Sequence, residues 1–268
     1  MQMKRIVITD LDGTLLDSRY CYDGSRDAIE LLKSKGIPLI FCSAKTRVEQ
    51  EEYRRELGIG DPFIVENGGA VLVPEGYFSF PITEARTIPG YHIIELGLPY
   101  ARVREILKTI ERELGISITG FADMSPEEVS QRTGLGSKFA VFSKMREYDE
   151  PFYLTCGSED AKRVLGGVRG AGLRCTPVGS HYSTIGNTDK GRAVRTLLGL
   201  FQREFGEIES IGLGDSQNDL PLLASVDVRI LVQRAPRQWV DLDLPGLHKV
   251  EGVGPEGWSQ AIEELFRR

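Results

Sequence analysis

Two carboxylates stand at the end of a short apolar run near the start of the chain, in Asp10-Leu11-Asp12-Gly13-Thr14 after Ile6-Val7-Ile8. The apolar run predicts a buried strand, and side chains alternate along a strand, so both carboxylates are expected on one face at its polar end. One carboxylate can attack phosphorus while its neighbour transfers protons, and a divalent cation reduces their repulsion. The same residues are also compatible with an ordinary acidic turn.

Three further fragments carry polar residues that follow apolar runs or open helices. Asp215 and Asp219 are four residues apart at a predicted helix start, where carboxylates and water can hold a hard cation such as Mg2+. The Ser43 hydroxyl ends another apolar strand and can donate to a phosphate oxygen, and Lys190 opens an amphipathic helix. Taken singly, these residues are equally typical of helix caps and solvated surface charges.

The four fragments come in the order in which the haloacid dehalogenase-like superfamily carries its motifs, and the chain resembles that superfamily. The resemblance implies that Asp10 is a nucleophile that forms an aspartyl-phosphate, and that Asp12 is the general acid and base. It further implies that Ser43 and Lys190 bind the transferring phosphoryl group. An aspartate at position 12 favours a phosphatase or phosphotransferase over a dehalogenase.

The same resemblance implies a bound Mg2+ ion. Asp10, the backbone carbonyl of Asp12, and Asp215 would be its ligands, and Asn218 with Asp219 would position them. Phosphoryl transfer asks a protein mainly for alignment and charge neutralisation, which agrees with such a site.

Composition excludes several other classes of protein. The chain has 268 residues and 41% hydrophobic content, enough for one large or two modest domains. Its net charge of −6 argues against a nucleic-acid partner. No apolar stretch approaches the ~20 residues of a membrane helix, and the scattered cysteines suit reduced thiols. We therefore expect a cytoplasmic protein with a small anionic substrate and no membrane partner; its oligomeric state is left open.

Strand and helix signals alternate, which predicts an α/β fold with a Rossmann-like, mostly parallel sheet. Core strands are expected over 4–9, 37–42, 62–66, 209–214 and 226–232, and core helices over 24–35, 46–57, 190–204, 217–224 and 256–267.

A segment over 84–184 interrupts this alternation and carries none of the four motifs. We predict that it is an inserted α/β cap domain, and that 1–83 and 185–268 form the catalytic core. The crossings are expected near 81–89 and 179–187. The segment includes a predicted strand over 91–96 and an amphipathic helix over 100–114.

A narrower resemblance rests on Ser43-Ala44-Lys45-Thr46-Arg47, which replaces the Thr-Gly-Arg of many sugar phosphatases with this cap type. It is similar to the Ser/Thr-x-Lys-Thr-Arg of mannosyl-3-phosphoglycerate phosphatases, as are the stretches 62–69, 146–150 and 186–191. The resemblance implies hydrolysis of mannosyl-3-phosphoglycerate to mannosylglycerate, a compatible solute, and phosphate.

Lys45 and Arg47 are candidate contacts for such an anionic substrate, because they open a helix next to the Ser43 site. Alternatively, they are helix residues that pair with Glu49, Glu51 or Glu52.

The resemblance also implies substrate contacts from Asn67, Gly68, His181 and Tyr182. Many relatives carry an arginine before an aromatic residue where this chain has His181-Tyr182, so a planar two-pronged donor is missing here. His181 can also be a surface or hydrogen-bonded core histidine.

Other functions remain open at this stage. The sugar of the substrate could be glucose, or the substrate could be a simpler sugar phosphate. A phosphomannomutase-like phosphotransferase would share the paired aspartates, and a binding protein on a retired enzyme scaffold would share the fold.

Overall fold

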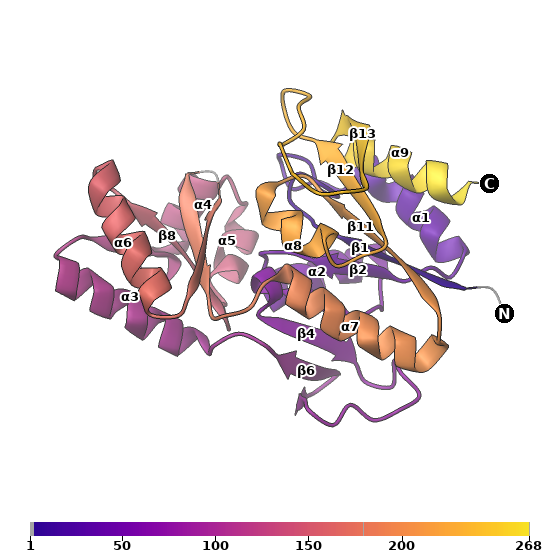
Figure 1. Ribbon diagram of the computed structural model, residues 1–268, viewed down its shortest axis with the longest axis horizontal. Helices are drawn as coiled ribbons and strands as arrows, with labels where there is room; N and C mark the ends of the chain where they lie inside the picture. Colours follow the sequence, from indigo (N-terminus) through magenta and orange to yellow (C-terminus); the bar gives the residue numbers. More distant parts are fainter. Residues whose placement is uncertain (1–2, 179, 268) are drawn as a thin grey trace.

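The computed structural model describes residues 3–178 and 180–267, so Gly179, part of the expected second crossing, lies outside the described residues. Within these ranges the chain forms a larger and a smaller sheet, with helices on both faces of each (Figure 1). Short 3-10 helices cover Asp23–Ser25, Glu66–Gly68, Phe121–Asp123 and Gln217–Asp219.

The larger sheet is mostly parallel, which confirms the predicted fold class. In the described part of the chain it has nine strands, in the order β13-β12-β11-β1-β2-β3-β4-β6-β5. Neighbours from β13 to β3 are parallel, and β4, β6 and β5 add an antiparallel edge. The strands are β1 (Lys4–Thr9), β2 (Leu39–Cys42), β3 (Phe63–Val65), β4 (Ala70–Pro74), β5 (Arg86–Ile88), β6 (Tyr91–Glu95), β11 (Ile208–Gly214), β12 (Val228–Gln233) and β13 (Leu247–Val253).

Apolar residues on both faces of the central strands explain why this sheet is buried. In β1, Val7 packs into one core cluster, whereas Ile6 and Ile8 pack into the other. The first cluster is covered by α1 (Arg26–Ser34), α2 (Arg47–Leu57) and α9 (Pro255–Phe266), and the second by α7 (Lys190–Phe205) and α8 (Leu220–Leu223). Parallel strands buried on both faces read as continuous apolar runs, as these do.

The smaller sheet is antiparallel and lies at the end of the molecule away from both termini (Figure 1). Its order is β7 (Ile118–Gly120), β8 (Asp149–Leu154), β10 (His181–Ile185) and β9 (Arg174–Val178). Helices α3 (Tyr100–Leu114) and α6 (Ser158–Gly170) cover one face. Helices α4 (Pro126–Thr133) and α5 (Ser137–Ser143) lie on the other, where the Phe139 ring stacks on Tyr53 of α2 at 4.9 Å.

The predicted helix over 100–114 is confirmed as α3. The strand predicted over 91–96 is β6, which we expected within the inserted segment. β6 pairs with β4 along its whole length, from Ala70↔Glu95 to Pro74↔Tyr91, and so belongs to the larger sheet. The backbone groups of a strand inside a sheet need partners on both sides, and β4 and β5 supply them for β6. We propose that the inserted unit spans 97–185 and not 84–184.

The two connections between the sheets lie side by side. A Cβ atom placed on Gly186 would lie 2.6 Å from the backbone nitrogen of Leu98. Next to them, the Thr188 hydroxyl donates to the Gly68 carbonyl at 3.0 Å. The chain therefore leaves the larger sheet and returns to it at neighbouring points.

None of the helices within 3–178 and 180–267 has the length and hydropathy needed to span a lipid bilayer. Cys21, Cys42, Cys156 and Cys175 are all free thiols.

Trp258 anchors α9 to the strand that carries the first motif. Its side chain is fully buried, and its Nε1 donates to the Thr9 hydroxyl at 3.0 Å, directly before Asp10. We expect Trp258→Ala to lower the free energy of unfolding by about 3–5 kcal/mol, because the cavity and the lost burial act together. Urea denaturation followed by circular dichroism measures this. The half-buried Trp239 gives the matched control, and an equal loss in Trp239→Ala would contradict the assignment.

Candidate active site

Asp10 and Asp12 lie where β1 ends, as predicted. The Asp10 N–H continues the ladder to β11 by donating to the Leu213 carbonyl at 2.9 Å, and its side chain is buried. Gly13 adopts a φ of 81°, and a Cβ there would lie 2.6 Å from Oδ2 of Asp215. Only glycine combines that conformation with such a close approach, so the turn brings the first and fourth motifs together.

A buried cluster of Asp10, Asp215 and Asp219 forms at this edge of the sheet. Each offers a carboxylate oxygen, and these oxygens lie within 4.8 Å of one another. The buried Lys190 ammonium contacts two of them, Oδ1 of Asp10 at 2.5 Å and Oδ1 of Asp219 at 2.7 Å. The structure thus brings together three motifs that lie far apart in the sequence.

The pKa values of this cluster reflect burial and mutual repulsion. Burial and the Asp219 charge raise the pKa of Asp10 to about 7, although Lys190 opposes the shift. Burial and the charges of Asp219 and Asp10 also raise the pKa of Asp215 well above its ordinary value. Burial disfavours ionisation of Asp219, but Lys190 and the donors on Ser216 and Asp215 outweigh it and lower its pKa.

This donor set fits a hard divalent cation, which prefers oxygen ligands and favours ionised carboxylates. Asp219 is already engaged, because its Oδ2 accepts from the N–H groups of Asp215 and Ser216 and from the Ser216 hydroxyl at 2.9–3.1 Å. The oxygens of Asp10 and Asp215 each accept at most one of the contacts described here, so each keeps a lone pair for a metal. Asp215 also contacts Nε of Arg234 at 3.1 Å and the Thr14 hydroxyl at 3.3 Å.

Ser43 and Lys45 follow β2 at the same edge. The buried Ser43 hydroxyl accepts the N–H of Lys45 at 3.3 Å, which leaves its own hydrogen for an anion. The Lys45 ammonium is also buried, lies 2.9 Å from Oδ1 of Asp12 and sits over the Tyr20 ring at 4.5 Å. Burial disfavours the charge of Lys45, but Asp12 and Glu49 outweigh it and raise its pKa, so it stays a cation.

A cavity of about 320 Å³ lies between the larger sheet and the inserted unit. Asp12, Lys45 and His181 line it, as predicted for substrate-binding or catalytic residues. Sequence reasoning missed the other polar side chains in its wall: Tyr20, Glu49, Arg132, Thr133, Ser143, Arg146, Asp149, Ser180, Ser183 and Arg234. A signal existed only for Arg146 and Asp149, which fall in the family-like stretch 146–150.

Two predicted substrate contacts lie elsewhere. Arg47 pairs with Glu51 at 3.2 Å and with Glu147 at 3.0 Å and does not line this cavity, which matches the alternative that it is an ion-paired helix residue. The Tyr182 ring stacks on Phe152 at 5.5 Å, inside the apolar cluster beneath α3 and α6. Side chains alternate along β10, so Tyr182 faces away from the cavity that His181 lines.

Asn67 and Gly68 connect parts of the site and do not line the cavity. The Asn67 amide donates to Asp149 and to Ser183, both at 2.9 Å, and accepts from the Asn218 amide at 2.9 Å. The Asn218 side chain therefore points to Asn67. Gly68 has a φ of 94°, and a Cβ there would lie 2.2 Å from the Asp189 carbonyl oxygen, which no side chain tolerates.

His181 does not supply the planar, charged donor that the family resemblance led us to expect here. Burial, together with the nearby Arg146 charge, lowers its pKa to about 4, so its imidazole is neutral near pH 7. Its ring lies beside Tyr153, with centroids 5.4 Å apart. His181 and the neighbouring Tyr153 therefore place uncharged aromatic rings at this side of the cavity.

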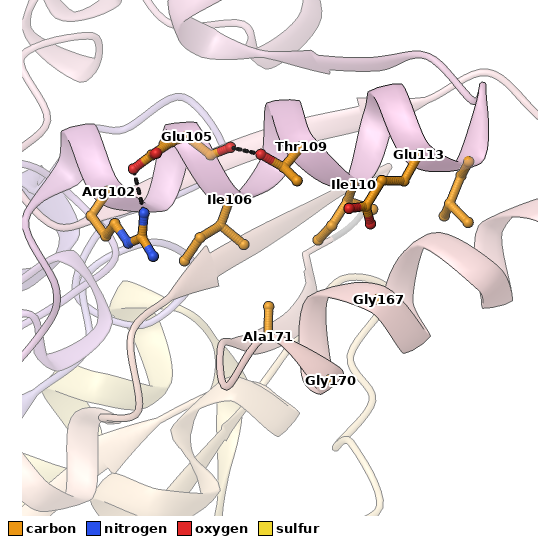
Figure 2. A pocket seen from close by; sticks show the side chains of 10 residues that line it. Arg102, Glu105, Ile106, Thr109, Ile110, Glu113, Gly167, Gly170 and Ala171 are labelled. Carbon is orange, nitrogen blue, oxygen red and sulfur yellow. Dashed lines mark hydrogen bonds and ion pairs between the residues drawn. The ribbon is translucent and has the colours of Figure 1, made fainter.

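A second hollow, of about 380 Å³, lies on the outer face of the inserted unit between α3 and α6 (Figure 2). Its floor is formed by Ile106, Ile110 and Gly167, and Arg102 pairs with Glu105 at its rim. It contains none of the predicted site residues. Asn67, Lys190 and Asn218 line a smaller hollow of about 260 Å³, whereas Asp12, Lys45 and His181 line the cavity between the two units, which we take as the candidate active site.

Comparison with known proteins shows which family the chain belongs to. The family described as haloacid dehalogenase-like hydrolases matches residues 7–96. A glucosyl-3-phosphoglycerate/mannosyl-3-phosphoglycerate phosphatase of Methanococcoides burtonii is 44% identical over 266 residues, 98% of each chain. A mannosyl-3-phosphoglycerate phosphatase of Pyrococcus horikoshii is 38% identical over 86% of this chain and 91% of that protein.

Among solved structures, a haloacid dehalogenase-like hydrolase of B. subtilis has a TM-score of 0.69 at 16% identity, covering 98% of this chain and 100% of the other, and shares the fold. The fold and the acidic site define a haloacid dehalogenase-like hydrolase. Within that class, the chain belongs to the family of phosphatases that the Methanococcoides and Pyrococcus proteins represent.

The raised pKa of Asp10 gives metal binding a predictable pH dependence. Without metal, the folded protein favours the protonated form of Asp10. The contribution of this carboxyl to the free energy of unfolding is therefore complete below its ordinary pKa of 3.8 and is lost as the pH rises through about 7. A metal needs the ionised form, so protons compete with it. We expect MgCl2 to raise Tm more at about pH 7.5 than at about pH 5, measured by differential scanning fluorimetry against chelator. Asp215→Asn should abolish the rise, and a pH-independent rise would count against this cluster as the metal site.

Proposed function

We propose that this protein is a Mg2+-dependent phosphatase that hydrolyses mannosyl-3-phosphoglycerate to mannosylglycerate and phosphate through an aspartyl-phosphate. The observation that carries the proposal is the contact of Lys190 with Asp10 and Asp219, beside Asp215 and next to a cavity shared by both units. The names of the 38% and 44% identical relatives support the substrate.

In this proposal Asp10 is the nucleophile. Lys190 holds its Oδ1, which leaves Oδ2 to attack phosphorus. The bond between phosphorus and the glycerate oxygen then breaks, and Asp12 gives its proton to that leaving oxygen. In the second step Asp12 takes a proton from water, which attacks phosphorus and releases Asp10 and inorganic phosphate.

Ser43 and Lys190 would hold the phosphoryl oxygens during both steps, by a hydroxyl donor and a positive charge. Asp10, Asp215 and the Asp12 carbonyl would hold Mg2+, which supplies further positive charge where the phosphoryl group gathers negative charge. Asp219 acts through these residues, since its carboxylate fixes Lys190 and the Asp215 backbone.

Glucosyl-3-phosphoglycerate is the second candidate substrate, because the 44% and 39% identical relatives are named for both sugars. The two sugars differ at one hydroxyl, and the cavity wall carries carboxylates, hydroxyls and arginines able to bind either epimer. A phosphomannomutase-like transfer would return the phosphoryl group to a sugar and would need a bisphosphate activator.

The test of the proposed function compares phosphate release from mannosyl-3-phosphoglycerate, glucosyl-3-phosphoglycerate, mannose 6-phosphate and 3-phosphoglycerate, each with MgCl2 and with chelator. We expect metal-dependent hydrolysis with the highest kcat/KM for a glycosylated phosphoglycerate. Equal, slow hydrolysis of all four would contradict the substrate assignment. Release only in the presence of a sugar bisphosphate would replace the phosphatase by a mutase.

The nucleophile has its own test. Asp10→Asn should lower kcat by at least about a thousandfold, because an amide cannot form the acyl-phosphate. Circular dichroism would verify the fold, and Asp27→Asn, an exposed aspartate on α1, is the control that should keep activity. A kcat of Asp10→Asn close to that of the wild type would contradict the proposed mechanism.

A further inference from the structure

We propose that Arg146 binds the carboxylate of the glycerate moiety and thereby makes the enzyme selective for acidic phosphoglycerate esters over neutral glycerol-type phosphate esters. This inference rests on the proposed function, and it assigns a specificity role to a residue outside the four motifs.

The Arg146 guanidinium is fixed in the wall of the cavity with one nitrogen free. Its side chain is only 5% exposed. Nε donates to the Ser143 carbonyl at 3.0 Å, and Nη1 donates to the Ala44 carbonyl at 3.1 Å and to Oδ1 of Asp149 at 3.3 Å. Within the described part of the chain, Nη2 has no hydrogen-bond partner. A guanidinium carries five N–H donors, so two remain for a ligand.

Nη2 is not among the fully buried atoms that lack a hydrogen-bond partner, and Arg146 lines the cavity, so Nη2 is accessible to a ligand there. A charged donor makes stronger hydrogen bonds to an anion than to a neutral acceptor, which makes an anionic ligand the natural complement of Nη2. Glu66 lies at 4.0 Å from Nη1, and together with Asp149 it balances part of the charge and holds the guanidinium in place. The rigid, planar group is therefore preorganised, and binding an anion would not require it to reorient.

The position of Arg146 fits the shape of the substrate. Its bond to the Ala44 carbonyl places it at the turn between Ser43 and Lys45, which is the expected phosphate site. In a 3-phosphoglycerate, only the ester oxygen and carbons C3 and C2 separate phosphorus from the carboxyl carbon. A phosphate held at Ser43 would therefore carry its carboxylate to the cavity wall nearby.

The other positive side chains of the cavity are less suited to this task. Lys45 is paired with Asp12, and the Arg234 side chain is 54% exposed and contacts Asp215. Arg132 is exposed and lies over the Tyr153 ring. Arg146 is the cavity arginine that is both buried and fixed from two sides, by the turn after β2 and by the inserted unit.

The experiment compares two substrates that differ only in the carboxylate. One is the preferred glycosyl-3-phosphoglycerate, and the other is the matching glycosylglycerol 3-phosphate, in which a CH2OH group replaces the carboxylate. We expect Arg146→Gln to lower kcat/KM for the acid by about 10- to 100-fold while the neutral ester changes by less than about threefold. Arg146→Lys, which keeps the charge but loses the fork, should give an intermediate selective loss.

Arg47→Gln is the matched control. Arg47 also bridges the core and the inserted unit, through Glu147, but does not line the cavity. A structural role moves both substrates by the same factor, so Arg47→Gln should leave the acid-to-neutral ratio unchanged. An equal effect of Arg146→Gln on both substrates would overturn the proposal. If Arg146→Gln melts below the assay temperature, the ratio in Arg146→Lys decides instead.

Failure of the proposed function would be seen separately, in the wild-type enzyme. If the wild type does not prefer glycosylated phosphoglycerates, the pair 3-phosphoglycerate and glycerol 3-phosphate carries the same carboxylate difference without a sugar. A selective loss on 3-phosphoglycerate in Arg146→Gln would then still support the carboxylate role, and an equal loss on both would reject it.

Discussion

The structure depends on one ammonium group placed between buried carboxylates. Asp10 and Asp215 directly follow β1 and β11, and Asp219 ends the short 3-10 helix after β11. Their negative charges would repel strongly away from water. Lys190, the first residue of α7, contacts two of them. Its positive charge lowers the electrostatic cost of burying these carboxylates, and its contact with Asp10 keeps that side chain oriented. The register of β1 against β11, with Thr9 opposite Leu213, is the constraint that brings these groups to one level.

The central sheet and its motif residues could be predicted because their signals are local. Continuous apolar runs indicate strands buried on both faces, and polar residues directly after them lie at the shared carboxyl edge of a parallel sheet. Each core strand expected from the sequence lies within two residues of its observed bounds. Asp10, Ser43 and Asp215 were expected at this edge for this reason, whereas the role of Lys190, at the start of a helix, was implied by the family resemblance.

Features that depend on distant partners were not predictable in this way. β6 looks like any strand, and its pairing with β4 decides that it extends the larger sheet. Which face His181 and Tyr182 take is set by the register of β10 against β8, since Tyr182 lies opposite Phe152. Arg47 has carboxylates within reach on its own helix, and the sequence does not show whether its guanidinium binds one of these or a substrate. The role proposed for Arg146 depends on its hydrogen bond to the Ala44 carbonyl, which lies outside the inserted unit and far away in the sequence.

The adjacent connections at Leu98 and Gly186 have a consequence for the history of such enzymes. Seen from the larger sheet, the inserted unit is one long excursion whose ends emerge at the same place. Its length and shape can then change without disturbing the strands that hold the carboxylates. Evolution can therefore replace the inserted unit as a whole, so that the substrate specificity changes while the catalytic residues of the larger sheet stay in place.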